Sequence, residues 1–273
     1  MRQALVLVMV AGGALMGAEP GMVFIPGGEF QQGRAARLPD TEVKWYPTAH
    51  KDDQPARRVT LDPFYLDEAE VTNEAYAAFA KAARHRTPYH WRKGVLPEGK
   101  ERHPVVNVSW EDAAAYCEWR GRRLPTEAEW ERAARGNAEG ALYAWGDREP
   151  KPTDARYNSE APLAVCSKTK NYFGLCDMTG NVWEWTADWY GRAYYAEGAA
   201  RNPGGPDSGL YRVLRGGSWF DQPGLFLMVS YRSWARPGER SATIGFRCAK
   251  DFGDRTKRPR YPMRAAPLSA RGK

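Results

Sequence analysis

The chain has 273 residues, of which 42% are hydrophobic, and a formal net charge of +7. No stretch rich in Pro, Gly and Ser divides it and no segment approaches the length of a membrane span, so we expect one domain and no membrane anchor. The basic excess is concentrated in residues 252–273, a segment that could touch an anionic surface or nucleic acid. We expect a solvated, disordered tail instead and no nucleic-acid partner.

Residues 1–18 are typical of a secretory signal peptide. Arg2 supplies the positive start, Ala4 to Met16 forms an apolar run too short to cross a bilayer, and Gly17-Ala18 is a small-residue exit. No lipoprotein cysteine follows, so we expect a periplasmic or secreted protein whose mature domain covers residues 19–251.

The first half of the domain predicts short strands. Residues 22–33 alternate around an I-P-G-G turn, which indicates a strand with a tight bend. Two further strands are expected at residues 59–61 and 64–66, on either side of Asp62-Pro63.

Three helix starts are readable in the sequence. One lies near Thr72 or Asn73, where apolar residues begin to recur at helical spacing. The other two are capping boxes, in which a Ser or Thr stands three residues before an acid: Ser109 with Asp112, and Thr126 with Glu129.

The stretch 174–190, G-L-C-D-M-T-G-N-V-W-E-W-T-A-D-W-Y, is unusually dense in Trp, Gly and acids. Asp177, Gly180 and Glu184 offer two carboxylates and a flexible backbone carbonyl within one turn, and calcium favours several such oxygen ligands. The alternative is a core turn whose acids are solvated or bonded to backbone amides. No zinc spacing, Ser-His-Asp arrangement or Walker loop competes, and we identify no catalytic residue.

Six blocks of the chain resemble the formylglycine-generating enzyme (sulfatase-modifying factor) family, and they occur in the family's order. The stretch 174–190 contains its G-N-x-W-E-W signature. The other blocks include M-V-F-I-P-G-G-E-F, P-V-V-N-V-S-W, G-R-R-L-P-T-E-A-E-W, Y-A-W-G-D and V-L-R-G-G-S-W with G-F-R-C-A. The resemblance implies an α+β, C-type-lectin-like fold with few regular elements and much ordered loop.

The resemblance also implies structural calcium. The ligands would be the side chains of Asp177 and Glu184 with the backbone carbonyls of Met178, Gly180 and Val182. A second calcium site would use Asn158 and the Ser159 carbonyl, although the acidic partner expected downstream is not evident.

Four cysteines in an exported chain indicate two disulfides. Cys117 and Cys248 match positions that are disulfide-bonded in some members of the family. Cys166 and Cys176 would close a small loop that leads into the proposed ion turn. We favour this pairing over its two alternatives.

The residues that would hold copper are missing. In the family, two cysteines just after G-G-S-[WY] bind copper and oxidise a sulfatase cysteine, and soft thiolates suit Cu(I). The corresponding stretch, residues 218–226, contains no cysteine, and Asp221 stands in the place of the first one. We therefore expect no copper and no sulfatase activation by the known mechanism.

Two classes of function remain. The first is a calcium-stabilised binding or accessory protein that is not active on sulfatases. We expect it to be a monomer that takes a protein, a peptide or a small molecule in a C-terminal groove. The second is an oxidoreductase: either a cysteine-free periplasmic tailoring oxidase akin to siderophore-maturation members of the family, or a sulfatase activator with an atypical site. The groove candidates are Trp183, Ser218, Trp219, Phe220, Asp221, Phe226, Arg232 and Trp234.

Overall fold

The computed structural model describes residues 19–35 and 52–253. The expected signal peptide lies outside these residues, and so does the expected tail from residue 254 onward. The described chain is a mixture of short strands, short helices and long ordered loops, so the α+β class predicted from the sequence is confirmed.

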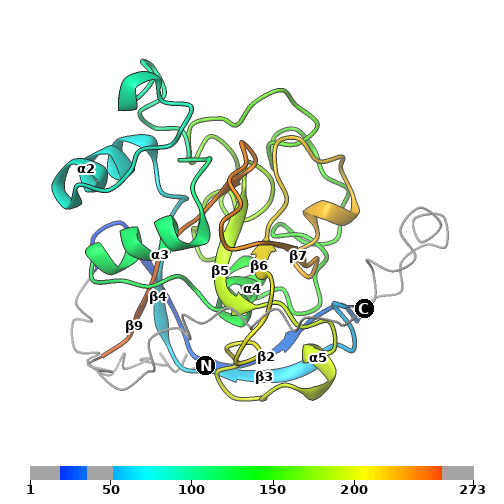
Figure 1. The fold of residues 1–273 in the computed structure, drawn as a ribbon. Helices are drawn as coiled ribbons and strands as arrows, with labels where there is room; N and C mark the ends of the chain where they lie inside the picture. The colour runs from blue at the N-terminus through cyan, green and yellow to red at the C-terminus, as the bar shows by residue number, and fades with distance from the viewer. Residues whose placement is uncertain (1–18, 36–51, 254–273) are drawn as a thin grey trace, which may run out of the picture.

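Within residues 19–35 and 52–253, nine short strands form three sheets, and Figure 1 shows how most of them are arranged. They are β1 (Met22–Ile25), β2 (Gly28–Gln32), β3 (Arg57–Leu61), β4 (Phe64–Asp67), β5 (Trp183–Trp189), β6 (Arg212–Arg215), β7 (Ser233–Ala235), β8 (Ile244–Gly245) and β9 (Ala249–Asp251). The strand orders are β1-β4-β9, β2-β3 and β7-β6-β5-β8. All neighbours are antiparallel except β5 and β8, which run parallel.

The predicted bend separates β1 from β2. A Cβ atom on Gly27 would lie 2.7 Å from the Pro63 nitrogen and 2.8 Å from the Leu61 carbonyl oxygen, so the bend requires glycine at this position. The two strands that it separates join different sheets, since β1 pairs with β4 and β2 pairs with β3.

The helices begin where the capping signals predicted. They are α2 (Asn73–Ala83), α3 (Trp110–Trp119), α4 (Glu127–Arg135) and the single turn α5 (Tyr194–Glu197), with two 3₁₀ turns, η1 (Arg92–Gly94) and η2 (Leu225–Leu227). Thr72 caps α2, and both capping boxes are present at the starts of α3 and α4. Figure 1 shows α2 and α3 together on one side of the molecule, with the β2-β3 pair at its base and β5 near the centre.

Strand β5 organises the interior. All seven of its residues are buried, and it pairs with β6 on one side and β8 on the other. Trp185 is fully buried and donates its indole N–H to the Val108 carbonyl at 3.2 Å, as expected of the tryptophan predicted to enter the core. The sequence predicted only a turn here, but residues 183–189 form this strand.

Two disulfides tie the loops to this framework. Cys117 on α3 is bonded to Cys248, and Cys166 is bonded to Cys176, which is the pairing predicted from the sequence. Within the described residues no helix is long and apolar enough to cross a membrane.

Candidate functional site

The turn that precedes β5 is built by close backbone contacts. Gly180 has a φ of 77° and donates its N–H to the Gly216 carbonyl at 2.8 Å. A Cβ atom there would lie 2.4 Å from the Arg156 carbonyl oxygen, so only glycine fits. Asp177 also has a positive φ, of 53°, and its Oδ2 accepts the Cys166 N–H at 2.7 Å. The Cys166–Cys176 disulfide therefore holds Asp177 in place.

Glu184, the second proposed calcium ligand, is fully buried and already bonded. Arg247 donates from Nη2 to Oε1 and from Nε to Oε2, both at 2.7 Å, and the Trp130 indole donates to Oε2 at 2.9 Å. This two-pronged pair with a buried arginine is a strong charge-assisted contact. Arg247, in the G-F-R motif, therefore has a structural role.

A third carboxylate, that of Glu70, joins this cluster. Its Oε2 accepts the Asn181 side-chain N–H at 2.8 Å, and its side chain is 2% exposed. Burial raises the pKa of Glu70 well above its ordinary value, and the charges of Asp177 and Glu184 raise it further. Sequence reasoning missed Glu70, because nothing in D-E-A-E-V-T-N distinguishes it from the neighbouring acids.

The carboxylates of Glu70, Asp177 and Glu184 share one arginine, and in the described residues they do not by themselves form a group of three that could hold a metal ion. Arg247 binds Glu184 directly. Its charge also partly offsets the rise that burial causes in the pKa of Glu70 and of Asp177, so one guanidinium acts on three carboxylates. Burial raises the pKa of Asp177, while the N–H that Cys166 donates to its Oδ2 opposes that rise. The neighbouring Thr179 Oγ1 is buried without a partner, and a cavity with room for about one water molecule borders Asp177 and Thr179. These oxygens fit calcium, which prefers carboxylate and carbonyl ligands.

Asn158 and Ser159, proposed for a second calcium, contact the loop that follows β6. The Asn158 N–H bonds to the Asp221 carbonyl and the Ser159 N–H to the Trp219 carbonyl, both at 2.8 Å. The Asn158 side chain accepts an N–H from Gln222 at 3.0 Å. These bonds fix the position of the loop, and they include no carboxylate that could complete an ion site.

Asp221 lies in this loop, at the position that the family resemblance gives to a copper ligand. Its Oδ2 accepts the Ser218 N–H at 2.8 Å and the Ser218 hydroxyl at 2.6 Å. Burial raises the pKa of Asp221, while the bonds from Ser218 and the Trp183 side chain oppose that rise. Asp221 as a residue is half-buried.

The structure brings several groove candidates together around Asp221. The Trp183 ring packs against Tyr231 at 6.0 Å, and Tyr231 packs edge-on against Phe226 at 5.2 Å. Trp219 is half-buried, and Phe220, in contact with it, is 66% exposed. Ser218 and Trp183 are themselves buried, and both donate hydrogen bonds to Asp221. Trp234 lies on β7 and stacks against Tyr190, 4.3 Å away.

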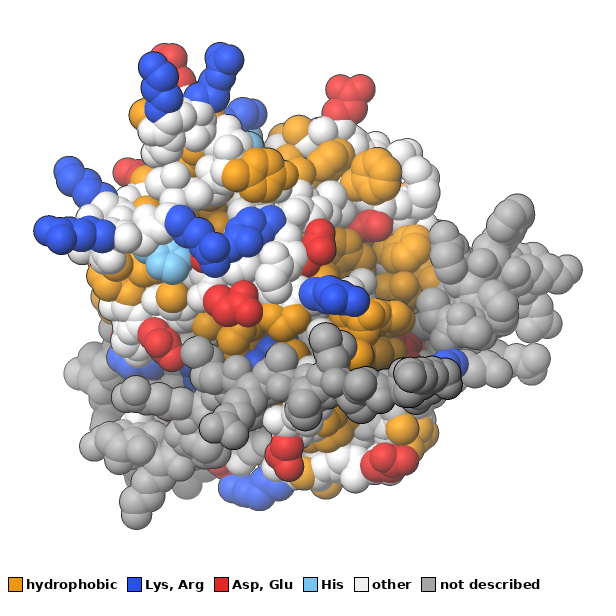
Figure 2. All heavy atoms as spheres, in the orientation of Figure 1, with side chains coloured by type: hydrophobic (Ala, Val, Ile, Leu, Met, Phe, Trp, Pro, Cys, Tyr) orange, Lys and Arg blue, Asp and Glu red, His pale blue; other side chains and the backbone are white. Residues whose placement is uncertain are grey.

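Hydrophobic side chains gather on this side of the molecule. Figure 2 shows them over β7 and η2, whereas basic side chains gather over α2 and the loop that follows it. The side chains of Phe220 and Trp234, at 66% and 40% exposed, are among the large hydrophobic groups open to solvent. Phe220 contacts Trp219 and Trp234 stacks on Tyr190, so each exposed ring is paired with a second ring.

The expectation that Arg232 lines the groove is corrected by the structure. Arg232 is 1% exposed, and its Nε and Nη2 donate to the two oxygens of Glu127 at 2.7 and 3.0 Å. The signal that placed it in the groove was its position after the aromatic stretch, but the ion pair with Glu127, 105 residues away, draws it into the interior.

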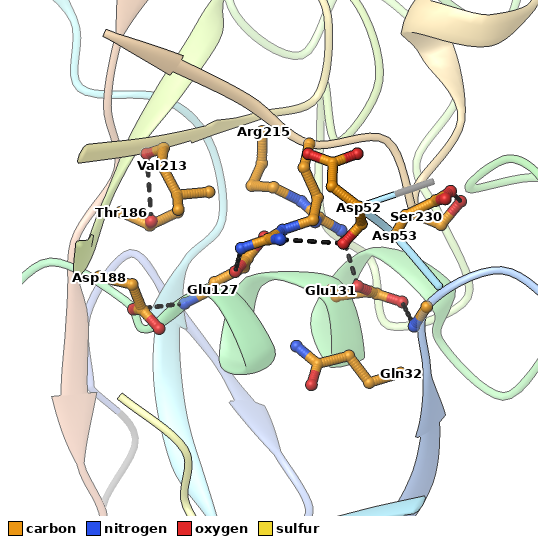
Figure 3. A network of polar contacts seen from close by, with 12 residues as sticks. Gln32, Asp52, Asp53, Glu127, Glu131, Thr186, Asp188, Val213, Arg215 and Ser230 are labelled. Carbon is orange, nitrogen blue, oxygen red and sulfur yellow. Dashed lines mark hydrogen bonds and ion pairs between the residues drawn. The ribbon is translucent and has the colours of Figure 1, made fainter. Parts of the chain in front are cut away.

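A buried polar network surrounds this ion pair (Figure 3). Arg215 on β6 donates to Glu127 at 2.8 Å and to Glu131 at 2.7 Å, and both acids project from α4. Asp188 on β5 accepts the Glu127 N–H at 2.8 Å. The network therefore joins α4 to strands β5 and β6 of the central sheet.

The thiol pair that copper would need does not exist in this chain. All four cysteines are in the two disulfides, and no free cysteine occurs. A half-buried carboxylate beside aromatic rings offers hard oxygen in place of two soft thiolates. The residues present therefore do not fit the copper centre that the resemblance implied.

Comparisons with known proteins agree with the fold. The sulfatase-modifying factor enzyme 1-like domain matches residues 11–252. The formylglycine-generating enzyme of Streptomyces coelicolor is 38% identical over 85% of this chain and 89% of its own length. The inactive C-alpha-formylglycine-generating enzyme 2 of Mus musculus is 34% identical over 86% of this chain and 87% of its own. The structure of PvdO from Pseudomonas aeruginosa superposes with a TM-score of 0.70 and 27% identity, covering 84% of this chain and 94% of PvdO.

Proposed function

This chain belongs to the sulfatase-modifying factor enzyme 1-like family, and from that premise we propose that it is an exported binding or accessory domain that does not activate sulfatases. The single observation that carries the proposal is the state of the cysteines. Both pairs are in disulfides, and neither lies in the stretch 218–226. A copper-thiolate oxidation of a substrate cysteine has no ligands here.

Among the relatives of this chain, one is named as an enzyme and another as an inactive one. The chain is similar both to a formylglycine-generating enzyme and to a mouse protein named as inactive. Function resides in the site and not in the fold, so the loss of the cysteine pair outweighs the overall similarity. Two disulfides also suit an oxidising compartment outside the cytosol.

We assign calcium a structural role in this domain. Asp177, with support from Glu70 and Glu184, would hold the ion in the turn before β5, and the backbone carbonyls of the same turn would complete the shell. The ion would balance the charge of three clustered carboxylates that share Arg247. The ion would stiffen the start of β5, where Trp183 is the first residue of the strand.

The function of the groove would be recognition. Phe220 and Trp219 are presented on a loop held at one side by Asn158 and Ser159, and at the other by bonds within the loop from Ser218 to Asp221. A loop fixed in this way loses little conformational freedom on binding, which favours affinity. The ligand would be a protein, a peptide or a small molecule.

A sulfatase-peptide oxidation assay tests the proposal. The purified mature protein is incubated with a C-x-P-x-R peptide and Cu(I), and the S. coelicolor formylglycine-generating enzyme serves as the positive control. We expect no formylglycine product from this chain and no copper retained after dialysis, whereas calcium should be retained in metal analysis. Copper-dependent conversion of the peptide would refute the proposal and require a different ligand set.

A further inference from the structure

A polar pocket lies between β2 and the C-terminal end of α4, and it shares no residue with the groove candidates. Figure 1 shows α4 beside the β2-β3 pair. The polar side chains that line the pocket are Glu29 and Gln31 from β2, Arg132 from α4, and Asn137 and Glu139 from the turn after α4. Its volume is about 200 Å³. This is below the range of about 300 to 1,000 Å³ that is typical of sites for drug-sized ligands, so the pocket suits a group the size of a single ring.

Two buried donors on these lining residues have no hydrogen-bond partner in the described part of the chain. They are Nε2 of Gln31 and Nε of Arg132, and a buried donor left unbonded costs free energy. Arg132 is fixed in place, because its Nη1 donates to the Gly136 carbonyl at 2.5 Å and its guanidinium lies 5.2 Å from the Phe173 ring. Gln31 is half-buried, and the last torsion of a glutamine is broad, so its amide can turn Nε2 into the pocket. The pocket therefore lacks acceptors, which a ligand would supply.

The charges around the pocket cancel one another. Arg58, on β3, pairs with both Glu29 and Glu139. The charge of Glu139 also opposes the lowering that burial causes in the pKa of Arg132. Arg135, which lines the pocket too, is bonded at 2.7 Å to an acid one turn earlier on α4. The two acids of the pocket are therefore balanced by two bases, and neither an anion nor a cation gains a net attraction there.

An exposed aromatic residue adjoins the pocket. Tyr172 is 70% exposed, and it packs against Gly136, which is one of the lining residues. A Cβ atom at Gly136 would lie 2.7 Å from the Tyr172 Cβ, and Gly136 has a φ of 60°, so this close approach requires glycine. An exposed ring next to polar groups suits a ligand that has both an apolar face and hydroxyl groups.

We propose that this pocket binds a neutral sugar ring. Hydroxyl oxygens of the sugar would accept hydrogen bonds from Gln31 and Arg132, and its hydroxyl hydrogens would bond to Glu29 and Glu139. A hydroxyl both donates and accepts, whereas a carboxylate only accepts and an ammonium group only donates, so a polyol matches this mixed lining best. The inference goes beyond the proposed function, because it assigns a ligand class to a site separate from the groove.

Titration calorimetry and saturation-transfer NMR of the purified mature protein test the proposal. The probes are the methyl glycosides of glucose, galactose and N-acetylglucosamine, each compared with the uronic acid and the amino sugar of the same configuration. We expect at least one neutral glycoside to bind. Its charged counterparts should bind about fivefold more weakly, because each meets a like charge in the pocket. Binding by none of the neutral glycosides would overturn the inference, and so would equal or tighter binding of the charged sugars.

Two variants locate the sugar in the pocket. Gln31→Leu should weaken glycoside binding about fivefold, the range for one hydrogen bond, without lowering the Tm, since it replaces an unbonded buried donor. A lower Tm with unchanged binding would mean that Gln31 is structural and would overturn the inference. Glu29→Gln should weaken binding about tenfold, because it removes a charged acceptor. The matched control Glu160→Gln removes an exposed acid outside the pocket and should bind as the wild type does.

A groove variant separates this inference from the proposed function. If Phe220→Ala abolishes glycoside binding and Gln31→Leu does not, the sugar binds in the groove, and the inference falls while the proposed binding function stands. If the sulfatase peptide is oxidised, the proposed function fails whatever the glycoside titration shows.

Discussion

Replacing Asp188 by Asn tests whether an acid in the core of this fold is protonated at neutral pH. Asp188 is 1% exposed on β5, and its Oδ2 accepts the Glu127 N–H. Burial raises the pKa of Asp188 to about 8, and the nearby charge of Glu127 raises it in the same direction. An asparagine oxygen can accept the same N–H, so the variant removes the ionisation and keeps the hydrogen bond.

The magnitude follows from proton linkage. The ordinary pKa of an aspartate is 3.8. Between pH 5 and 7 the unfolded chain is therefore ionised at Asp188 while the folded protein holds a proton. The free energy of unfolding then falls by about 1.4 kcal/mol for each unit of rising pH, or about 2.7 kcal/mol between pH 5 and 7. This contribution is fully present below the unfolded pKa and is lost as the pH rises through the folded pKa near 8.

Urea unfolding at pH 5, 6, 7 and 9 measures this effect. The free energy of unfolding of Asp188→Asn, relative to wild type, should rise by about 2.7 kcal/mol from pH 5 to 7 and level off above pH 8. Asp207→Asn, at an exposed position, is the control and should run parallel to wild type. Parallel profiles for Asp188→Asn and wild type would refute the reasoning, since they would mean that the buried carboxylate is ionised and stabilised by Arg232.

Two further predictions concern the turn before β5 and the disulfides. When calcium is present at about 100 times its Kd, the free energy of unfolding of the wild type should rise by about 2.7 kcal/mol. A chelator should then lower the Tm of the wild type. Asp177→Asn should melt lower in calcium and lose the chelator response, whereas an equal response in both proteins would exclude a calcium site at Asp177. Glu184→Gln is a poorer test, because it also breaks the bond to Arg247. Replacing both Cys166 and Cys176 by Ser should lower the free energy of unfolding by about 3 kcal/mol in urea titrations, and replacing Cys117 and Cys248 should lower it by about 5 kcal/mol. A smaller loss of unfolding free energy on removing the Cys117–Cys248 bond than on removing the Cys166–Cys176 bond would contradict the chain-entropy account.

The features that the sequence predicted well are the ones that short segments determine. The starts of α3 and α4 follow from a Ser or Thr and an acid three residues apart, and both capping boxes are formed. The bend between β1 and β2 follows from Gly27, and the cysteine pairing followed from the family resemblance and the short 166–176 loop. The capping boxes and the Cys166–Cys176 bond depend on neighbours within about ten residues, whereas the Cys117–Cys248 bond joins positions 131 apart and was predicted from the family resemblance alone.

The features that the sequence did not predict depend on distant partners. Glu70 bonds to Asn181, 111 residues away, and Glu184 bonds to Arg247, 63 residues away. Arg232 was placed in the groove because its local neighbours are aromatic, but its partner Glu127 belongs to another helix. Strand β5 was missed for a related reason. Its Glu and Asp look exposed in the sequence, and they are buried because α4 and Arg247 supply their hydrogen bonds.

The bond between Cys117 and Cys248 closes 131 residues of the chain into a covalent ring. Strand β5, the loop that carries Asp221 and the Cys166–Cys176 bridge all belong to this ring. A protease that cuts an exposed loop such as residues 197–201 would therefore leave both fragments attached, and the cut would become visible on a gel only after reduction. Such a cut opens the ring, but the Cys117–Cys248 bond still joins the two fragments. Exchange of loop 219–224 for another sequence would leave the ring closed, because both cysteines lie outside that loop.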